Sequence, residues 1–191
     1  MRNEYFHGNS DQIHNYTTMK LILLGYMGSG KSAVGQHLAN TLNYSFQDLD
    51  ELIEEQEECT ISKLFSNKGE IYFRRKEIEA LLDQLQTKSS LVLSTGGGTP
   101  CYGSNMDLLL EKDEVITIYM KASISNLTER LLKEKGKRPL IDHINTKDEL
   151  QEFIGKHLFE RAPIYERSQI IINTTDLTVS EISEQIISQL F

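Results

Sequence analysis

Short apolar runs alternate with amphipathic stretches along most of the chain. The apolar runs are typical of buried strands, and they lie at 20–24, 44–47, 90–94, 115–120 and 169–172. Residues with helical spacing predict helices at 31–42, 49–57, 60–67, 70–86, 104–111, 123–134, 147–161 and 178–190, with Thr60, Ser123 and Thr178 as N-caps. Strands that alternate with helices predict an α/β protein, with a parallel sheet covered by helices on both faces.

The length of the chain sets the domain organisation that we expect. Its 191 residues, of which 39% are hydrophobic, are enough for one well-buried core. Residues 1–18 are polar and lack periodicity, which predicts a disordered leader ahead of a single domain at 19–191. The charged segment at about 135–147 contains Gly136 and Pro139, and it predicts a mobile lid loop.

Charge and cysteine content exclude several classes of protein. The net charge of -8 argues against a broad nucleic-acid surface, because such surfaces need clustered Lys and Arg. Cys59 and Cys101 lie far apart with no metal-ligand spacing, which fits a reducing compartment, and we interpret both as core or loop residues. No apolar run is long enough to span a membrane, and no segment resembles a signal peptide. We therefore expect a cytoplasmic protein with no nucleic-acid or membrane partner.

A phosphate-binding loop follows the first predicted strand. The residues that fit the pattern G-x-x-x-x-G-K-[ST] are Gly25, Tyr26, Met27, Gly28, Ser29, Gly30, Lys31 and Ser32. Glycines allow the backbone N–H groups to surround phosphate oxygens, and the helix that follows adds the positive end of its dipole. Lys31 is expected to reach the β- and γ-phosphates, and Ser32 to ligate Mg²⁺. The sequence therefore predicts a bound nucleotide but does not identify the acceptor.

Two acids, Asp48 and Asp50, follow the second predicted strand, at the edge where open α/β sheets bind ligands. If the backbone is still extended there, both carboxylates point the same way. Such a pair is stable chiefly around a cation or a hydroxyl donor, and Mg²⁺ is the natural cation beside a P-loop. Equally, both acids could simply cap and charge the first turn of the next helix.

Arg74 lies four residues after Glu70 and three residues before Glu77, so the three side chains share one helical face. One interpretation is an exposed ladder of salt bridges, which is the more frequent meaning of such spacing. The other is that Arg74 binds a substrate carboxylate and is held in place by a neighbouring glutamate.

Three glycines in succession, Gly96, Gly97 and Gly98, follow the third predicted strand. A run of this kind indicates a backbone that a ligand approaches closely. Arg138, in the predicted lid, could reach the phosphates as an arginine finger or could be solvated surface. Arg161 comes shortly before Pro163, which is expected to break or kink the helix and leave Arg161 near its end.

Together these motifs resemble shikimate kinase, a family of small-molecule P-loop kinases, from Met19 to about Phe191. The resemblance rests on the P-loop, on D-x-D at Asp48, on F-R-x-x-E around Arg74, on G-G-G-T, on R-P-L at Arg138 and on R-A-P-x-Y at Arg161. It implies a P-loop kinase fold, with a five-stranded parallel sheet of order 2-3-1-4-5 and a lid. It also implies transfer of the γ-phosphoryl group of ATP, the co-substrate, to the 3-hydroxyl of shikimate in chorismate and aromatic amino acid biosynthesis, with Mg²⁺ as cofactor.

We expect the protein to be a monomer. The resemblance also assigns the site residues. It implies that ATP is bound by Gly28, Ser29, Gly30, Lys31, Ser32, Ala33 and Arg138, and that the catalytic residues are Lys31, Asp50 and Arg138. Arg74 and Arg161 should hold the shikimate carboxylate, and Asp50 should hold hydroxyl groups together with the backbone of Gly96, Gly97 and Gly98. Mg²⁺ should be bound by Ser32 and, through water, by Asp48. Arg130 is a candidate for a further lid-side arginine, and the expected adenine loop at 173–176 lacks the basic residue that relatives often carry.

Two other classes of function stay open on the sequence alone. One is another kinase of the same architecture, acting on gluconate or a nucleotide. Arg74 with Arg161 argues for an acceptor that carries a carboxylate. The acid pair of Asp48 and Asp50 argues for a polyol rather than a nucleotide base. The other is a catalytically silent nucleotide-binding module that regulates a partner. Such a module would have no use for the full set of candidate catalytic and metal-binding residues, which are Lys31, Ser32, Asp48, Asp50 and Arg138.

Overall fold

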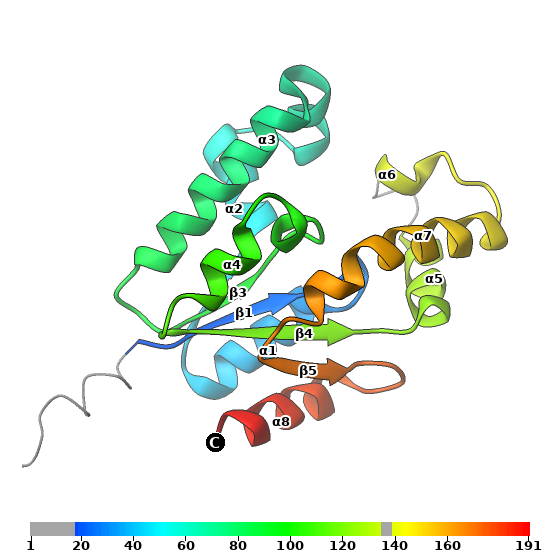
Figure 1. Cartoon of the computed structure of the whole chain (residues 1–191). Coiled ribbons are helices and arrows are strands. Elements are labelled where there is room, and N and C mark those ends of the chain that lie inside the picture. Colours follow the sequence, from blue (N-terminus) through cyan, green and yellow to red (C-terminus); the bar gives the residue numbers. More distant parts are fainter. Residues whose placement is uncertain (1–17, 135–138) are drawn as a thin grey trace, which may run out of the picture.

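A single parallel sheet organises the computed structural model, which describes residues 18–134 and 139–191 (Figure 1). Its strands are β1 (Lys20–Leu24), β2 (Ser45–Asp48), β3 (Leu91–Ser94), β4 (Val115–Lys121) and β5 (Ile170–Asn173). Within the described residues they pair in the order β2-β3-β1-β4-β5, and every pairing is parallel. This confirms the predicted P-loop kinase fold and its strand order.

Helices cover both faces of the sheet. They are α1 (Lys31–Leu42), α2 (Leu49–Glu57), α3 (Ile61–Gln86), α4 (Asn105–Leu110), α5 (Ile124–Lys133), α6 (Pro139–Asp142), α7 (Lys147–Tyr165) and α8 (Val179–Leu190), with a 3-10 turn, η2, at Thr99–Cys101. Thr60, Ser123 and Thr178 each accept a backbone hydrogen bond at a helix start, as predicted.

Successive residues of β1 divide the core into two layers. Leu21 and Leu23 pack with residues of α1 and α8 on one face, whereas Ile22 and Leu24 pack with residues of α2, α3 and α4 on the other. All four side chains are fully buried. β1 is therefore fixed from both sides, and the loop that follows it has a rigid starting point.

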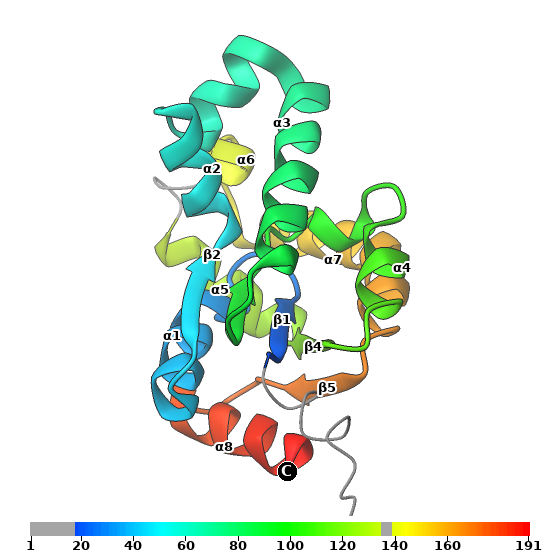
Figure 2. The same cartoon turned by 90° about the vertical axis from the view of Figure 1, so that its left-hand side faces the viewer.

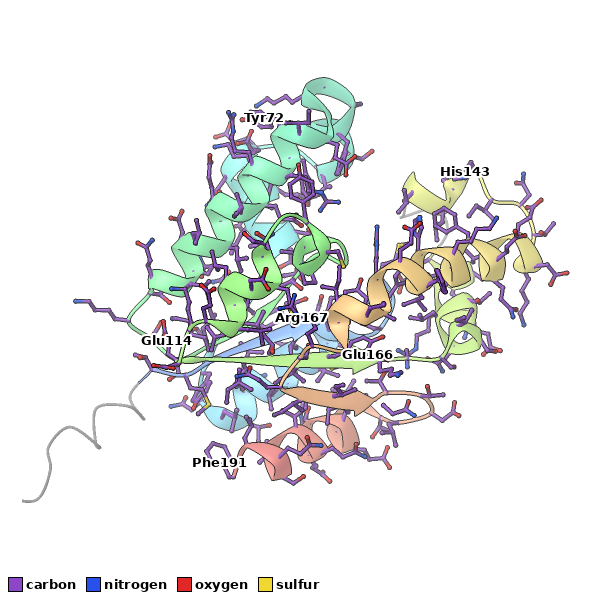
Figure 3. The ribbon with its side chains drawn as sticks, viewed as in Figure 1. Tyr72, Glu114, His143, Glu166, Arg167 and Phe191 are labelled. Carbon is purple, nitrogen blue, oxygen red and sulfur yellow. The ribbon has the colours of Figure 1, made fainter. Side chains whose placement is uncertain are left out.

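Two groups of helices project beyond the carboxyl ends of the strands (Figures 1 and 2). One consists of α2 and the outer part of α3, where Tyr72 lies. The other consists of α5, α6 and α7, with His143 just after α6 (Figure 3). A third apolar cluster joins the second group to the P-loop, because Tyr26 packs there with Leu127, Ile141 and other residues. The strand ends between the two groups are where the site residues gather.

Two local predictions were wrong, namely an extended backbone at Asp50 and a helix break at Pro163. The second strand runs to Asp48 and α2 begins at Leu49, so the chain is not extended at Asp50 and the alternation argument for the two acids fails. Pro163 does not break α7, which continues two residues past it to Tyr165. The predicted lid contains the short helix α6, whereas residues 135–138 and the predicted leader, apart from Thr18, lie outside the described residues. By contrast, the two helices expected at 60–67 and 70–86 are confirmed as two helical parts of α3, because Gly69 between them has non-helical backbone angles (φ 80°, ψ 171°).

Candidate active site

The P-loop connects β1 to α1 through a backbone that only glycine adopts without strain. Gly25, Gly28 and Gly30 have φ angles of 143°, 79° and 96°. At Gly25 a β-carbon would also lie 2.8 Å from the backbone carbonyl oxygen of Met120 on the neighbouring strand. The two strands thus set the curvature of the loop, and α1 begins directly after it with Gly30 as its N-cap. This is the geometry of an anion site at a helix N-terminus.

Lys31 is nearly buried, and its ammonium group faces the inside of this loop. Its Nζ donates hydrogen bonds to the carbonyl oxygens of Gly25, at 2.9 Å, and of Tyr26, at 3.1 Å. These bonds hold the positive charge over the loop, where phosphate oxygens would lie.

Asp48 uses its two carboxylate oxygens for different purposes. Oδ1 accepts from the backbone N–H of Asp50 at 3.1 Å and caps α2. Oδ2 accepts from the Ser32 hydroxyl at 2.6 Å. The carboxylate is therefore both the helix cap that one interpretation expected and a neighbour of the P-loop that the other expected.

The Ser32 and Asp48 oxygens fit a magnesium ion. Both are hard oxygen donors, and they lie together at the start of α1, beside the phosphate loop. Within residues 18–134 and 139–191, no three His, Cys, Asp or Glu side chains form a ready-made metal site. A magnesium ion at this place would thus need nucleotide phosphates and water to complete its ligands, as is usual for Mg²⁺.

Asp50 lies in the first turn of α2, and its carboxylate faces the site interior. The pKa of Asp50 is raised to about 6, chiefly by burial and also by the nearby carboxylates of Asp48 and Glu77, whereas Lys31 acts in the opposite direction. A carboxyl group with such a pKa is a better proton acceptor than an ordinary aspartate while still being ionised at neutral pH.

The three glycines after β3 each leave room for a different neighbour. A β-carbon at Gly96 would lie 3.1 Å from Asp50 Oδ1, and one at Gly97 would lie 3.3 Å from the backbone nitrogen of Met27 in the P-loop. At Gly98 it would lie 2.8 Å from Nη2 of Arg74. The run therefore passes between the acid, the P-loop and the arginine, and any side chain would separate them.

Arg74 reaches Gly98 from α3 and is held there by carboxylates. Its Nη1 donates to Glu77 Oε2 at 2.7 Å, and its Nε lies 3.4 Å from Glu70 Oε1. Glu77 is only 1% exposed, so this pair is not the surface ladder of the first interpretation. A mostly buried arginine that still has N–H groups facing a glycine turn is suited to bind a carboxylate.

Arg161 comes from α7, which packs against η2. Its guanidinium carbon lies 5.9 Å from the centre of the Tyr26 ring, and Tyr26 is hydrogen-bonded to Nδ1 of His157 at 3.0 Å. Burial raises the pKa of the Cys101 thiol, whereas the charges of Arg161 and Arg74 both lower it. Both guanidinium groups thus lie within electrostatic range of one thiol on η2, which places them at the same end of the site.

A cavity of about 440 Å³ lies along the P-loop. Its lining includes most of the predicted nucleotide-binding residues and both acids, and the full set is Met27, Gly28, Ser29, Gly30, Lys31, Ser32, Ala33, Val34, Asp48, Asp50, Ser94, Thr95, Gly96, Gly97, Arg130, Glu134, Leu177, Val179 and Ile182. Gly98, Arg74 and Arg161 are outside this set, although Gly98 directly follows the lining residue Gly97 and lies against Arg74.

Some functional candidates were missed or left open by the sequence. Arg130 does reach the site, because its Nη1 donates to the carbonyl oxygens of Gly28, at 3.2 Å, and of Ser29, at 3.3 Å. Leu177 and Val179 form an apolar part of the cavity wall, which was missed from the sequence. Two apolar residues on either side of the Thr178 helix cap were the sequence signal that could have indicated it. Arg138 lies outside the described residues.

The fold and the phosphate-binding loop define a small-molecule kinase of the P-loop class. The family model described as "Shikimate kinase" matches residues 27–191. The chain is 44% identical to a shikimate kinase of Flavobacterium psychrophilum over 172 residues, which are 90% of this chain and 99% of the relative. This protein therefore belongs to the shikimate kinase family.

Solved structures agree with this assignment. A shikimate kinase from Bacteroides thetaiotaomicron superposes with a TM-score of 0.82 at 33% identity, covering 90% of this chain and 98% of that one. A shikimate kinase from Acinetobacter baumannii, solved in complex with shikimate, gives a TM-score of 0.81 at 29% identity, covering 93% of this chain and 96% of that one. In the part of the chain that our structure describes, every helix is too short or too polar to cross a bilayer.

Proposed function

We propose that this protein transfers the γ-phosphoryl group of ATP to the 3-hydroxyl of shikimate, giving shikimate 3-phosphate and ADP in aromatic amino acid biosynthesis. The observation that carries the proposal is the glycine run at Gly96–Gly98. Gly96 lies beside the Asp50 carboxylate, Gly97 beside the backbone of the P-loop, and Gly98 beside the Arg74 guanidinium. A small hydroxylated acid bound there would have its carboxylate and its reacting hydroxyl fixed at once relative to the phosphate loop.

On the donor side, the P-loop N–H groups and Lys31 bind the phosphates. Lys31 stabilises negative charge on the transferring group, and Arg138 completes the charge neutralisation from the lid at about 135–147. The apolar side chains at Leu177 and Val179 support stacking of the nucleotide base. Arg130, bonded to the loop carbonyls, orients the loop and adds positive charge.

On the acceptor side, Arg74 and Arg161 bind the carboxylate. Asp50 and the backbone of Gly96, Gly97 and Gly98 bind the hydroxyl groups. The hydroxyl oxygen attacks the γ-phosphorus, the bond from phosphorus to the ADP oxygen breaks, and Asp50 receives the hydroxyl proton. The raised pKa of Asp50 suits this transfer near neutral pH.

Magnesium, when bound, neutralises charge on the phosphates. Ser32 would hold it directly and Asp48 through water, which the 2.6 Å contact between their oxygens supports. Ser32 and Asp48 also position the start of α1 relative to α2, and hence the phosphate loop relative to Asp50.

We also propose a cytoplasmic monomer with one domain at 19–191. Cys59 and Cys101 form no disulfide, which suits a reducing compartment. Light scattering after size-exclusion chromatography tests the oligomeric state, and a mass near 22 kDa is expected.

Substrate-dependent ATP consumption by the purified protein tests the function. ADP release is measured with shikimate, quinate, gluconate and nucleoside monophosphates as acceptors. We expect turnover with shikimate at least about 100-fold above that with the others. Nucleoside monophosphates lack the carboxylate, whereas quinate and gluconate carry a carboxylate and hydroxyl groups in a different spatial arrangement. Preferred turnover of gluconate or of a nucleotide would overturn the proposal, and no turnover with any acceptor would favour a silent module.

A further inference from the structure

The buried carboxylate of Glu77 is hydrogen-bonded to Arg74, the proposed acceptor arginine, and its two oxygens have different partners. Glu77 Oε2 accepts from Arg74 Nη1 at 2.7 Å. Glu77 Oε1 accepts from the hydroxyl of Thr99 at 2.6 Å. A carboxylate that is 1% exposed needs its hydrogen bonds, so the plane of the Glu77 carboxylate is set by both donors together.

Thr99 is fixed more firmly than an ordinary hydroxyl residue. Its side chain is fully buried, and it begins the η2 turn directly after the glycine run. Its backbone nitrogen donates to the Gly96 carbonyl oxygen at 3.2 Å, and its own carbonyl oxygen accepts from the buried side chain of Asn105 at 2.8 Å. With a β-branched side chain as well, Thr99 has little rotamer freedom, and its single proton is committed to Glu77.

The contact between Thr99 and Glu77 lies next to the reacting groups. A β-carbon at Gly96 would be within 3.1 Å of Glu77 Oε1, of Thr99 Oγ1 and of Asp50 Oδ1 alike. The three oxygens therefore surround one point above the glycine run. A change in the orientation of the Glu77 carboxylate would alter both the position of Arg74 and the surroundings of the Asp50 carboxylate.

We propose that Thr99 is a positioning residue for substrate binding, whose buried hydroxyl holds Glu77 so that the other Glu77 oxygen fixes Arg74 toward the acceptor carboxylate. The inference rests on the proposed function, because it takes Arg74 as the carboxylate anchor. It adds a residue that contacts no substrate atom itself and acts through two side chains.

Three variants separate this role from general stability. Thr99→Val keeps the shape but replaces the donor with a methyl group, and we expect KM for shikimate to rise about tenfold or more, with KM for ATP unchanged. Thr99→Ser keeps the donor and should stay within about threefold of the wild type. Thr117→Val is the matched control, because Thr117 is equally buried and its hydroxyl bonds the Gln169 side chain at 3.0 Å, far from Arg74 along the chain. It should lower Tm without changing KM for shikimate.

A further variant, Thr99→Ala, keeps the proposal testable if Thr99→Val does not fold. Thr99→Ala leaves space for a water molecule instead of placing a methyl group against the carboxylate, so it is expected to fold and to raise KM for shikimate about threefold or more. In an Arg74→Ala background the Thr99 substitution should add nothing further to KM for shikimate, because the residue through which it acts is gone.

The possible outcomes distinguish the two proposals. Wild-type protein that does not phosphorylate shikimate overturns the proposed function and, with it, this inference. Wild-type protein that is active, with an unchanged KM for shikimate in Thr99→Val or in Thr99→Ala, overturns the inference alone. Full additivity with Arg74→Ala would also contradict it.

Discussion

The two ends of the site are built by different means. At the phosphate end, glycines with positive φ fix the backbone, and Lys31 is held by main-chain carbonyl oxygens. At the carboxylate end, side chains hold other side chains: Thr99 orients Glu77, and Glu77 holds Arg74. A backbone loop binds any phosphate of suitable size, whereas a network of oriented side chains can discriminate between acceptors. We therefore expect damage to the first end to affect ATP handling and damage to the second to affect acceptor selection.

The acid between the two ends should give the largest effect. Asp50→Asn removes the proton acceptor while it leaves the shape intact, and we expect kcat to fall by about 10² to 10⁴ with little change in KM for ATP. Steady-state kinetics in an ADP-release assay measure both values. Near-normal turnover would exclude Asp50 as the base.

The same variant has a stability signature whose sign follows from the pKa. The folded-state pKa of Asp50, about 6, exceeds the ordinary value of 3.8, so this residue favours folding below pH 3.8 and loses that contribution as the pH rises through about 6. At pH 7.5 the ionised carboxylate therefore costs stability. Asp50→Asn should raise the free energy of unfolding there by up to about 3 kcal/mol, and by much less at pH 4. A lower Tm at pH 7.5 would contradict the burial of this carboxylate.

The two arginines should separate binding from stability at the carboxylate end. Arg74→Ala and Arg161→Ala should each raise KM for shikimate by an amount equivalent to about 2 to 5 kcal/mol. Only Arg74→Ala should also lower Tm strongly, because it leaves the buried Glu77 without its cation. Thermal melts and kinetics on both variants check this. Unchanged KM in both would place the carboxylate elsewhere.

Substitutions at the adjacent glycines Gly97 and Gly98 also test whether the phosphate end and the carboxylate end are separate, with a smaller expected effect. Gly97→Ala presses on the backbone nitrogen of Met27, and Gly98→Ala presses on the guanidinium of Arg74. We expect the first to raise KM for ATP and the second to raise KM for shikimate, each about tenfold. If both variants changed the same parameter, the glycine run would not divide the two ends.

The smallest effect is expected at the amino terminus. Deletion of residues 1–18 should leave Tm and kcat unchanged, because their composition predicts no packed structure. Melting curves and the ADP-release assay on the shortened chain measure this. A clear loss in either would show that the segment contributes to the domain.

The contrast between the two ends also explains what the sequence could predict. The P-loop is one contiguous motif between a strand and a helix, so its place and chemistry were predictable from local pattern, as was the alternation of strands and helices. The strand order was not given by periodicity and came from the family resemblance. Long-range pairings such as Thr99 with Glu77 have no local signature, since they depend on how η2 packs against α3.

Two errors have a clear physical reason. Alternation along a strand was extended to Asp50, but the Asp48 side chain caps α2 and begins a helix there, so local hydrogen bonding ended the strand. Pro163 was expected to break or kink α7; it does not break the helix, since it lies in the last turn and two further residues follow it, and Arg161 lies near the helix end as predicted. Asp50 nevertheless lines the cavity, and the guanidinium group of Arg161 lies over the ring of Tyr26 in the P-loop.

Charge recognition at the acceptor end can be measured directly with a neutral substrate analogue. kcat/KM is determined for shikimate and for its carboxamide, which lacks the charge but keeps the ring and the hydroxyls, with wild-type protein and with the Arg74→Ala/Arg161→Ala double variant. We predict that the wild type prefers shikimate by about 100-fold or more and that the double variant shows almost no preference. Equal kcat/KM for the two substrates in the wild type, or a preference retained in the double variant, would contradict a carboxylate anchor at Arg74 and Arg161.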